Sequence, residues 1–148
     1  MRLSADADYA LRAAIELAAA PDGRLTAEHL AQAQDIPETA LATILTHLRR
    51  SNLVRSQRGP DGGFWLARPP AAISLAQIIR AIDGQSPGAR AERPEGERPE
   101  GERPEGGRLE NYRGAAAPLE RVWTALRAHE REVLEAVTLA DIISGNVP

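Results

Sequence analysis

The sequence of 148 residues contains no cysteine. The protein therefore cannot form a disulfide bond, supply a thiolate ligand to a metal ion or use a thiol as a nucleophile. Its three histidines, His29, His47 and His129, lie on three separate segments, so exposed positions on the surface are the default for all of them. We expect no metal site and no cofactor.

Long apolar runs are also missing. No stretch approaches the roughly 20 apolar residues that a membrane-spanning helix needs, and the N-terminal segment lacks the basic-then-apolar order of a signal peptide. We expect a cytoplasmic protein with one domain and an appended element, because 148 residues leave no room for two independent cores. The sequence has neither a nucleophile–base–acid set nor a phosphate-binding loop, so we do not expect an enzyme.

Lysine is absent, and the arginines are concentrated in one region. The formal net charge of −3 is unusual for a DNA-binding protein, because affinity for DNA depends mainly on neutralised phosphates. The acidic excess, however, lies largely between Glu92 and Glu105. The segment from Leu45 to Arg68 has a single acid, Asp61, and five arginines, which are Arg49, Arg50, Arg55, Arg58 and Arg68. This distribution favours a local basic surface.

Apolar residues at helical spacing and N-cap residues divide the first 84 residues into short elements. Turns at residues 21–23 and 35–37 separate the first three helices, and Pro37 suits the first position of the third, where its missing N–H is not needed. The predicted elements are helices at Ser4–Ala20 (capped by Ser4), Ala27–Gln34 (capped by Thr26), Pro37–Asn52 and Leu75–Asp83 (capped by Ser74), with strands at Leu53–Val54 and Phe64–Leu66.

The second and third predicted helices resemble a DNA-reading unit. Two short helices joined by a tight turn, with an amphipathic second helix, are typical of a helix-turn-helix. The apolar face of that second helix would consist of Leu41, Ile44, Leu45 and Leu48. The two strands flank a glycine-rich turn at Gly59–Gly63, which indicates a β-hairpin in the position of a wing. The sequence therefore predicts a mainly α-helical, winged helix-turn-helix fold with a small β-hairpin.

The second half of the chain combines a low-complexity segment with a long helix. Three copies of Glu-Arg-Pro-Glu-Gly begin at Glu92, Glu97 and Glu102, and this period suits neither a helix nor a strand. Helical spacing returns from Ala116 to Ala136, and Thr138 caps a last helix at Leu139–Ser144. The long helix has an apolar stripe, which consists of Leu119, Val122, Trp123, Leu126 and Val133.

An apolar stripe of this length needs a cover, and a second copy of the same helix is the simplest one, because symmetric dimers are the commonest oligomers. We therefore expect a homodimer. The predicted division is a winged helix-turn-helix DNA-binding domain at residues 1–84, a disordered low-complexity loop at residues 85–115, and a dimerisation helix followed by a short helix at residues 116–148.

Several segments of the chain, taken in order, resemble a known family. They are LSADADYALRAAIELA, then DIPETALATILTHLRRSNLVRSQRGPDGGFWLARP with ISLAQIIRAIDG, and finally VTLADI. These segments resemble the Rrf-two (Rrf2) family of winged-helix transcriptional regulators. The resemblance implies a DNA-binding homodimer held together by the long C-terminal helix.

The same resemblance bears on cofactors. Many members of the family hold an iron–sulfur cluster through three cysteines in the loop before the long helix, and a nitric oxide sensor of the family adds a carboxylate at the position of Asp8. One carboxylate without thiolates cannot hold such a cluster. The chain therefore looks like a cysteine-free, cluster-free branch of the family.

The polar face of the third predicted helix is expected to enter the major groove. Its candidate contacts are Glu38, Thr39, Thr43 and His47, because these residues lie opposite the apolar face. At the wing, Arg58 with Gly59 suits a minor groove, whereas phosphates are the expected partners of Arg49, Arg50 and Arg55. The competing interpretation of the helix residues is a solvated surface, since any amphipathic helix has a polar outer face. For Arg58 it is a solvated arginine of the turn, and for Arg49 a solvated helix end is nearly as good an explanation as a phosphate contact.

Four aromatic residues could line an effector pocket near the dimerisation helix: Tyr9, Trp65, Tyr112 and Trp123. For Trp123, a place in the core or the dimer seam is the favoured interpretation. The favoured function is a sequence-specific transcriptional regulator, a repressor, that binds a palindromic operator as a homodimer without an iron–sulfur cluster. The alternatives are a protein-interaction adaptor with a winged fold, and a regulator that senses a small molecule in the aromatic pocket.

Overall fold

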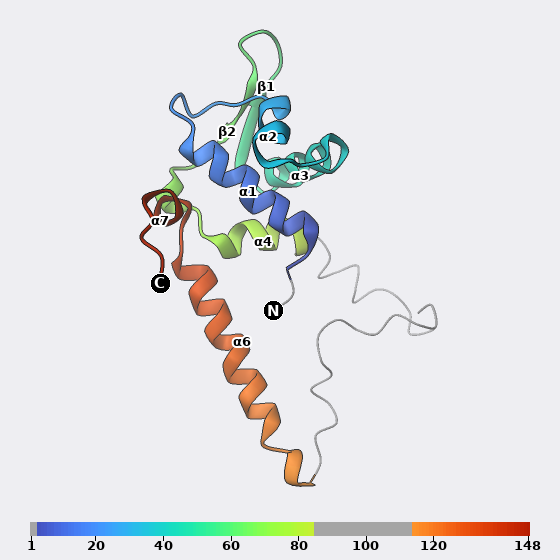
Figure 1. The fold of residues 1–148 in the computed structure, drawn as a ribbon, viewed down its shortest axis with the longest axis vertical. Helices are drawn as coiled ribbons and strands as arrows, with labels where there is room; N and C mark the ends of the chain where they lie inside the picture. The colour runs from blue at the N-terminus through green and yellow to red at the C-terminus, as the bar shows by residue number, and fades with distance from the viewer. Residues whose placement is uncertain (1–2, 85–113) are drawn as a thin grey trace, which may run out of the picture.

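The structure of the protein is a computed structural model that describes residues 3–84 and 114–148. Within these ranges, helices and one β-hairpin form a body from which a long helix projects (Figure 1). The elements are α1 (Ala5–Ala19), α2 (Ala27–Gln34), α3 (Glu38–Arg50), β1 (Val54–Gln57), β2 (Gly63–Leu66), η1 (Pro70–Ala72), α4 (Leu75–Asp83), η3 (Gly114–Ala116), α6 (Leu119–Ala136) and α7 (Leu139–Ser144). The predicted fold class, mainly α-helical with a small hairpin, is confirmed.

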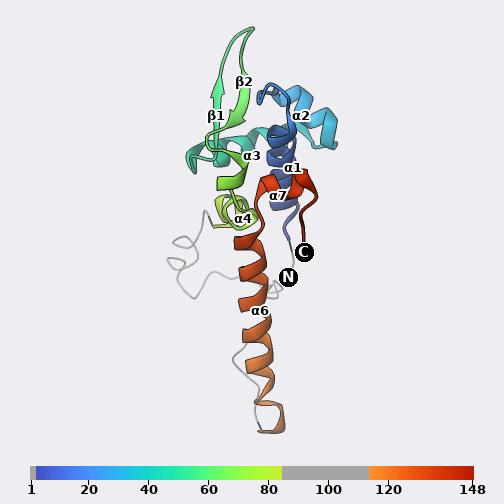
Figure 2. The same cartoon turned by 90° about the vertical axis from the view of Figure 1, so that its left-hand side faces the viewer.

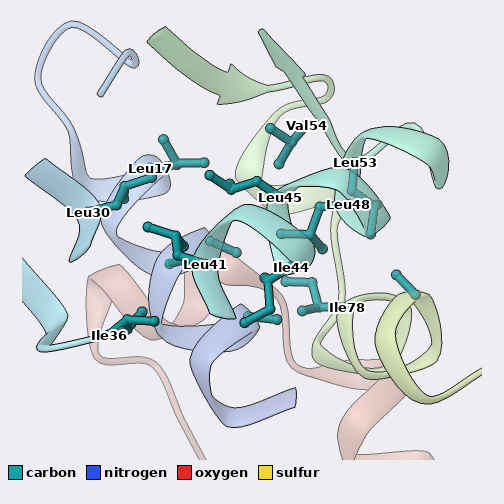
Figure 3. Close-up of a cluster of buried hydrophobic side chains, with 14 of the residues drawn as sticks. Leu17, Leu30, Ile36, Leu41, Ile44, Leu45, Leu48, Leu53, Val54 and Ile78 are labelled. Carbon is teal, nitrogen blue, oxygen red and sulfur yellow. The ribbon is translucent and has the colours of Figure 1, made fainter. Parts of the chain in front are cut away.

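Helix α3 lies in the centre of the hydrophobic core. Its predicted apolar face, Leu41, Ile44, Leu45 and Leu48, is buried. Each of these side chains is at most 2% exposed. These residues pack with buried side chains of α1, α2, β1 and α4, among them Leu17, Leu30, Val54 and Ile78 (Figure 3). Truncating one such leucine to alanine typically lowers the free energy of unfolding by about 2–5 kcal/mol, so the orientation of α3 is strongly fixed.

The turn between α2 and α3 is anchored in the core. Asp35 adopts a left-handed conformation with φ of 51°, and the N–H of Ile36 donates to the carbonyl oxygen of Ala31 at 2.9 Å. The side chain of Ile36 is only 4% exposed. Helix α3 begins at Glu38, one residue later than predicted, because Pro37 has an extended ψ of 132°.

Helix α3 ends at Arg50, two residues before the predicted end, because Asn52 is left-handed with φ of 57°. The N–H of Leu53 donates to the carbonyl oxygen of Leu48 at 3.0 Å, and the Leu53 side chain is buried. A left-handed residue followed by a buried apolar residue is a common way to end a helix. Here it directs the chain from α3 into the hairpin.

Strands β1 and β2 form the wing. The antiparallel register runs from the pair Val54 and Leu66 to the pair Gln57 and Gly63, so β1 extends three residues beyond the predicted strand. At the turn, an added Cβ on Gly62 would lie 2.4 Å from the carbonyl oxygen of Gln57. The turn therefore requires glycine at position 62.

The C-terminal helix α7 returns to the body. The N–H of Leu139 donates to the carbonyl oxygen of Ile73, and the N–H of Leu75 donates to that of Val137, both at 3.0 Å. Leu139 is fully buried, and α7 packs against α1 and η1 (Figure 2). The short helix that follows α6 is thus part of the body.

Two N-caps meet where α4 and α7 begin. Ser74 and Thr138 cap these helices as predicted, and the two residues also form an isolated β-bridge. The backbone N–H and the hydroxyl of Thr138 both donate to the carboxylate of Asp141. These two hydrogen bonds, of which the backbone one contributes more, lower the pKa of that carboxyl group. This junction connects the body to the end of α6.

Helix α6 extends away from the body with no buried residue along its length (Figures 1 and 2). It begins at Leu119 rather than at Ala116, which belongs to the short 3₁₀ turn η3. Only its C-terminal end contacts α4, where Arg80 pairs with Glu135 at 3.6 Å. Residues 85–113, with the Glu-Arg-Pro-Glu-Gly repeats, lie outside the described residues.

Replacing Asn52 with valine should destabilise the protein, because a β-branched residue is strained in the left-handed conformation. We expect Asn52→Val to lower the free energy of unfolding by about 1–2 kcal/mol, measured by urea denaturation. Asn52→Gly is the matched control, since glycine adopts this conformation readily, and it should stay close to the parent. Equal losses in the two variants would show that a side-chain contact, and not the backbone, requires asparagine.

Candidate nucleic-acid interface

The N-terminal half of α3 presents its polar face to solvent. Glu38, Thr39 and Thr43 are exposed, because they lie opposite the buried apolar face of the same helix. The hydroxyl of Thr43 donates to the carbonyl oxygen of Thr39 at 3.4 Å, which is a long and weak hydrogen bond. The hydroxyl of Thr43 can therefore exchange its present partner for a base edge or a phosphate.

The C-terminal half of α3 has a narrower polar face. His47 is half-buried, and its Nδ1 atom is shielded from solvent without a hydrogen-bond partner among the described residues. The neighbouring Thr46 is also half-buried and donates to the carbonyl oxygen of Ala42 at 2.9 Å. His47 thus lies at the border between the polar face and the core, whereas the threonines of the first half lie fully outside.

The arginines of the predicted interface are exposed: Arg49 and Arg50 at the end of α3, Arg55 on β1 and Arg58 at the wing. Within residues 3–84 and 114–148, none of these four side chains forms an ion pair. Unpaired guanidinium groups are well suited to phosphate, which they bind in a bidentate manner. The end of α3 and the hairpin therefore present guanidinium groups that form no ion pair with an acidic side chain of the described residues.

The wing extends this basic surface away from the body. Beyond the last strand pair, the chain turns through residues 58–62, and Gly59 has a positive φ of 107° that other residues rarely adopt. Arg58 is the first residue of this turn, at the far end of the hairpin. The base of the hairpin lies beside α3 (Figure 1). The far end of α6 lies at the opposite end of the molecule (Figures 1 and 2).

One residue beside the candidate interface that the sequence did not point to is Arg24, on the segment between α1 and α2. Its Nη1 donates to the carbonyl oxygen of Asp61 at 2.6 Å, and its guanidinium carbon lies 4.5 Å from the centroid of the Trp65 ring. Arg24 thus spans the hairpin from β2 to the turn. No local pattern marks this contact, because Arg24 and Asp61 are 37 residues apart in the chain.

The four residues of the predicted aromatic pocket lie in different surroundings. Tyr9 on α1 lies beside Arg12, whose guanidinium carbon is 4.9 Å from the centroid of the tyrosine ring. Trp123 is on α6, and Tyr112 lies outside the described residues. Trp65 lines a groove of about 560 Å³ between the end of α1 and the hairpin. The other lining residues are Leu17, Ala18, Asp22, Gly23, Arg24, Leu66, Ala67, Arg68, Pro69 and Pro70.

The predicted dimerisation stripe is exposed over most of α6. The exposed fractions are 40% for Leu119, 55% for Val122, 39% for Trp123 and 47% for Leu126, whereas Val133, close to the body, is half-buried. These large apolar side chains stand out, because exposed apolar residues in a row mark a surface that another element covers. Among the described helices, none has the length and apolar character to cross a membrane.

A buried helix face, an exposed reading face and a basic hairpin define a winged helix-turn-helix DNA-binding protein. The model of the Rrf2 family, described as iron-dependent transcriptional regulators, matches residues 3–145. The chain belongs to the Rrf2 family of transcriptional regulators. It is 44% identical to Rv1287 of Mycobacterium tuberculosis (strain ATCC 25618 / H37Rv), named as an HTH-type transcriptional regulator, over 100% of this chain and 84% of that protein.

Two further relatives agree with this assignment. The HTH-type transcriptional regulator IscR of Cereibacter sphaeroides is 32% identical over 99% of this chain and 90% of its own length. The solved structure of CymR, the global cysteine regulator of Bacillus subtilis, superposes with a TM-score of 0.71 at 31% identity, covering 97% of both chains. The predicted membership of this family, and with it DNA binding in transcription, is confirmed.

The family description mentions iron, and the residues of this chain do not fit an iron–sulfur cluster. Such clusters are held mainly by cysteine thiolates, and the whole sequence has none. Asp8, the one carboxylate suggested by the resemblance, pairs with Arg12 at 3.1 Å. Among the described residues, there is no group of three or more histidine or acidic side chains that could hold a metal ion.

Proposed function

We propose that the protein is a sequence-specific repressor that binds a palindromic operator as a homodimer, in the cytoplasm and without catalytic activity of its own. The observation that carries the proposal is the exposed polar face of α3, whose orientation is fixed by the buried apolar face of the same helix. Arginines at the end of α3 and on the hairpin continue this face, and among the described residues they pair with no acidic side chain. A dimer that occupies a promoter excludes other DNA-binding proteins, so repression requires no additional surface.

In this proposal, two sets of residues divide the work of binding. Thr39 and Thr43 read base edges in the major groove, because their hydroxyl and methyl groups can meet polar base edges and thymine methyl groups. Arg49, Arg50 and Arg55 neutralise phosphates and supply affinity without sequence information. Arg58 enters the minor groove from the wing, where the negative potential is strongest if the groove is narrow.

Two substitutions on α3 should separate reading from charge neutralisation. Arg50→Ala should weaken binding to every duplex alike and flatten the slope of log affinity against log salt by about two units per dimer, because two phosphate contacts are lost. Thr43→Ala should leave that slope intact and reduce the preference for the operator over random DNA by roughly fivefold or more per half-site. Fluorescence anisotropy at several salt concentrations measures both quantities.

Each outcome of this titration is informative. If Thr43→Ala weakens operator and random duplexes equally, α3 is not the reading helix. If the parent protein binds no duplex at low salt, the winged fold serves as a protein-interaction adaptor instead. A mutated half-site that Thr43→Ala binds as well as the operator would identify the base pair that Thr43 reads.

The homodimer in this proposal forms along α6. The 18 residues of this helix span about 27 Å, and its apolar stripe is exposed over most of that length. A second copy suits the stripe, because a two-fold axis places identical apolar residues opposite one another. Two-fold symmetry also presents two copies of α3 to the DNA, which requires a palindromic operator.

A charge placed in the stripe should therefore dissociate the dimer. Leu126→Glu buries a carboxylate in the proposed seam, and we expect the variant to sediment as a monomer at concentrations where the parent is a dimer. Arg127→Glu is the matched control, since it introduces the same carboxylate one residue away on the polar side of α6, and it should remain dimeric. A monomeric parent, or an undisturbed dimer of Leu126→Glu, would contradict the proposed seam.

We further propose that this regulator works without an iron–sulfur cluster, because the donor set for one is missing. Protein purified anaerobically should contain no stoichiometric iron and show no charge-transfer absorption band in the visible range. A relative that has the three cysteines, prepared in parallel, is the control for the procedure. Stoichiometric, coloured iron in this chain would show that other ligands hold a cluster.

A further inference from the structure

Arg24 lies outside both the helix-turn-helix and the hairpin, yet it contacts the hairpin at two points. The segment between α1 and α2 crosses beside the hairpin (Figure 1), where Leu25 forms an isolated bridge with Phe64 of β2. From this segment the Arg24 side chain stacks on Trp65, 4.5 Å from the ring centroid. Its Nη1 then reaches the carbonyl oxygen of Asp61, in the turn of the wing, at 2.6 Å.

The backbone around Arg24 is built for this close approach. The N–H groups of Leu25 and Phe64 each donate to the other residue's carbonyl oxygen, at 3.0 and 2.7 Å. A Cβ on Gly63, which has φ of 146°, would lie 2.9 Å from the carbonyl oxygen of Leu25 and 3.0 Å from Cγ of Arg24. Glycine at position 63 therefore leaves room both for the backbone pairing of Leu25 with Phe64 and for the side chain of Arg24.

Among the described residues, few other contacts hold the far end of the hairpin. Strand pairing ends at Gln57 and Gly63, and beyond that pair the turn has a backbone hydrogen bond from the N–H of Gly62 to the carbonyl oxygen of Gly59. A two-stranded hairpin is only marginally stable by itself in water. The contact from Arg24 to Asp61 thus connects the turn to the body three residues after Arg58.

We propose that Arg24 is a positioning residue for DNA binding, which holds the wing so that Arg58 is presented to the minor groove. This inference rests on the proposed function, since it assumes that Arg58 contacts DNA. Arg24 acts through the hairpin: a stacked guanidinium that already donates to a backbone carbonyl restrains the turn, and it contributes no phosphate contact of its own.

A double-mutant cycle tests whether Arg24 acts through Arg58. Arg24→Ala should weaken operator binding by roughly three- to tenfold, since it removes a stacking contact and a charge-assisted hydrogen bond, and the salt slope should not change. In an Arg58→Ala background, the same substitution should weaken binding less than twofold, because the residue it positions is gone. Trp65→Leu removes the stacking partner instead, and it should reproduce the effect of Arg24→Ala.

Amide hydrogen exchange supplies a readout that does not depend on DNA. In Arg24→Ala, the amide of Gly62 should exchange faster, while amides in the core of α3 keep the protection of the parent. Arg12→Ala is the matched control, because Arg12 also stacks on an aromatic ring, Tyr9, and donates to a backbone carbonyl, that of Gln34 at 2.8 Å. Losing Arg12 should not change exchange in the wing.

The outcomes distinguish this inference from the proposed function. If Arg24→Ala flattens the salt slope, Arg24 contacts phosphate directly. If it costs the same affinity with and without Arg58, Arg24 does not act through Arg58. Either result contradicts the inference. If Arg58→Ala itself leaves affinity unchanged, the wing assignment in the proposed function fails, and with it the role of Arg24 in binding. Unchanged exchange at Gly62 would show that Arg24 does not restrain the turn.

Discussion

The burial of one face of α3 is the interaction on which the rest of the structure depends. Leu41, Ile44 and Leu48 are almost completely inaccessible, so α3 cannot rotate without exposing them, and its other face must point outward. The residues that flank the helix are buried as well, Ile36 before it and Leu53 after it. One apolar stripe therefore fixes three things together: the exposed threonines, the angle of the helix-turn-helix, and the point where the wing begins.

Features that depend on neighbouring residues could be predicted from the sequence. The four N-caps named from sequence each accept a hydrogen bond from a backbone N–H three residues later, because a cap involves only the first turn of its helix; they are Ser4, Thr26, Ser74 and Thr138. The ends of α3 were misplaced by one or two residues, because the backbone angles of Pro37 and Asn52 decide them. Apolar spacing gives the face of a helix more reliably than its ends.

Features that depend on distant residues could not be predicted. Nothing in the sequence distinguishes Arg24 from the other arginines. Its contacts with Asp61 and Trp65 exist only once the hairpin has folded beside it. The backbone hydrogen bond that joins Leu139 to the body also depends on distant residues, because it requires α7 to return to α1. His47 illustrates a finer limit: helical spacing gives its direction, but its partial burial depends on what packs beside α3.

Among residues 3–84 and 114–148, helix α6 is held at its C-terminal end, where the capped starts of α4 and α7 meet, so it can act mechanically as a lever. Over about 27 Å, a tilt of about 5° at this joint displaces the far end by roughly 2 Å. In the proposed dimer joined along α6, the joint would set how far apart the two copies of α3 stand, whereas the exposed face of α3 would set which bases they prefer. Half-site spacing and base preference are then separate traits, and mutation can change one while the other is retained.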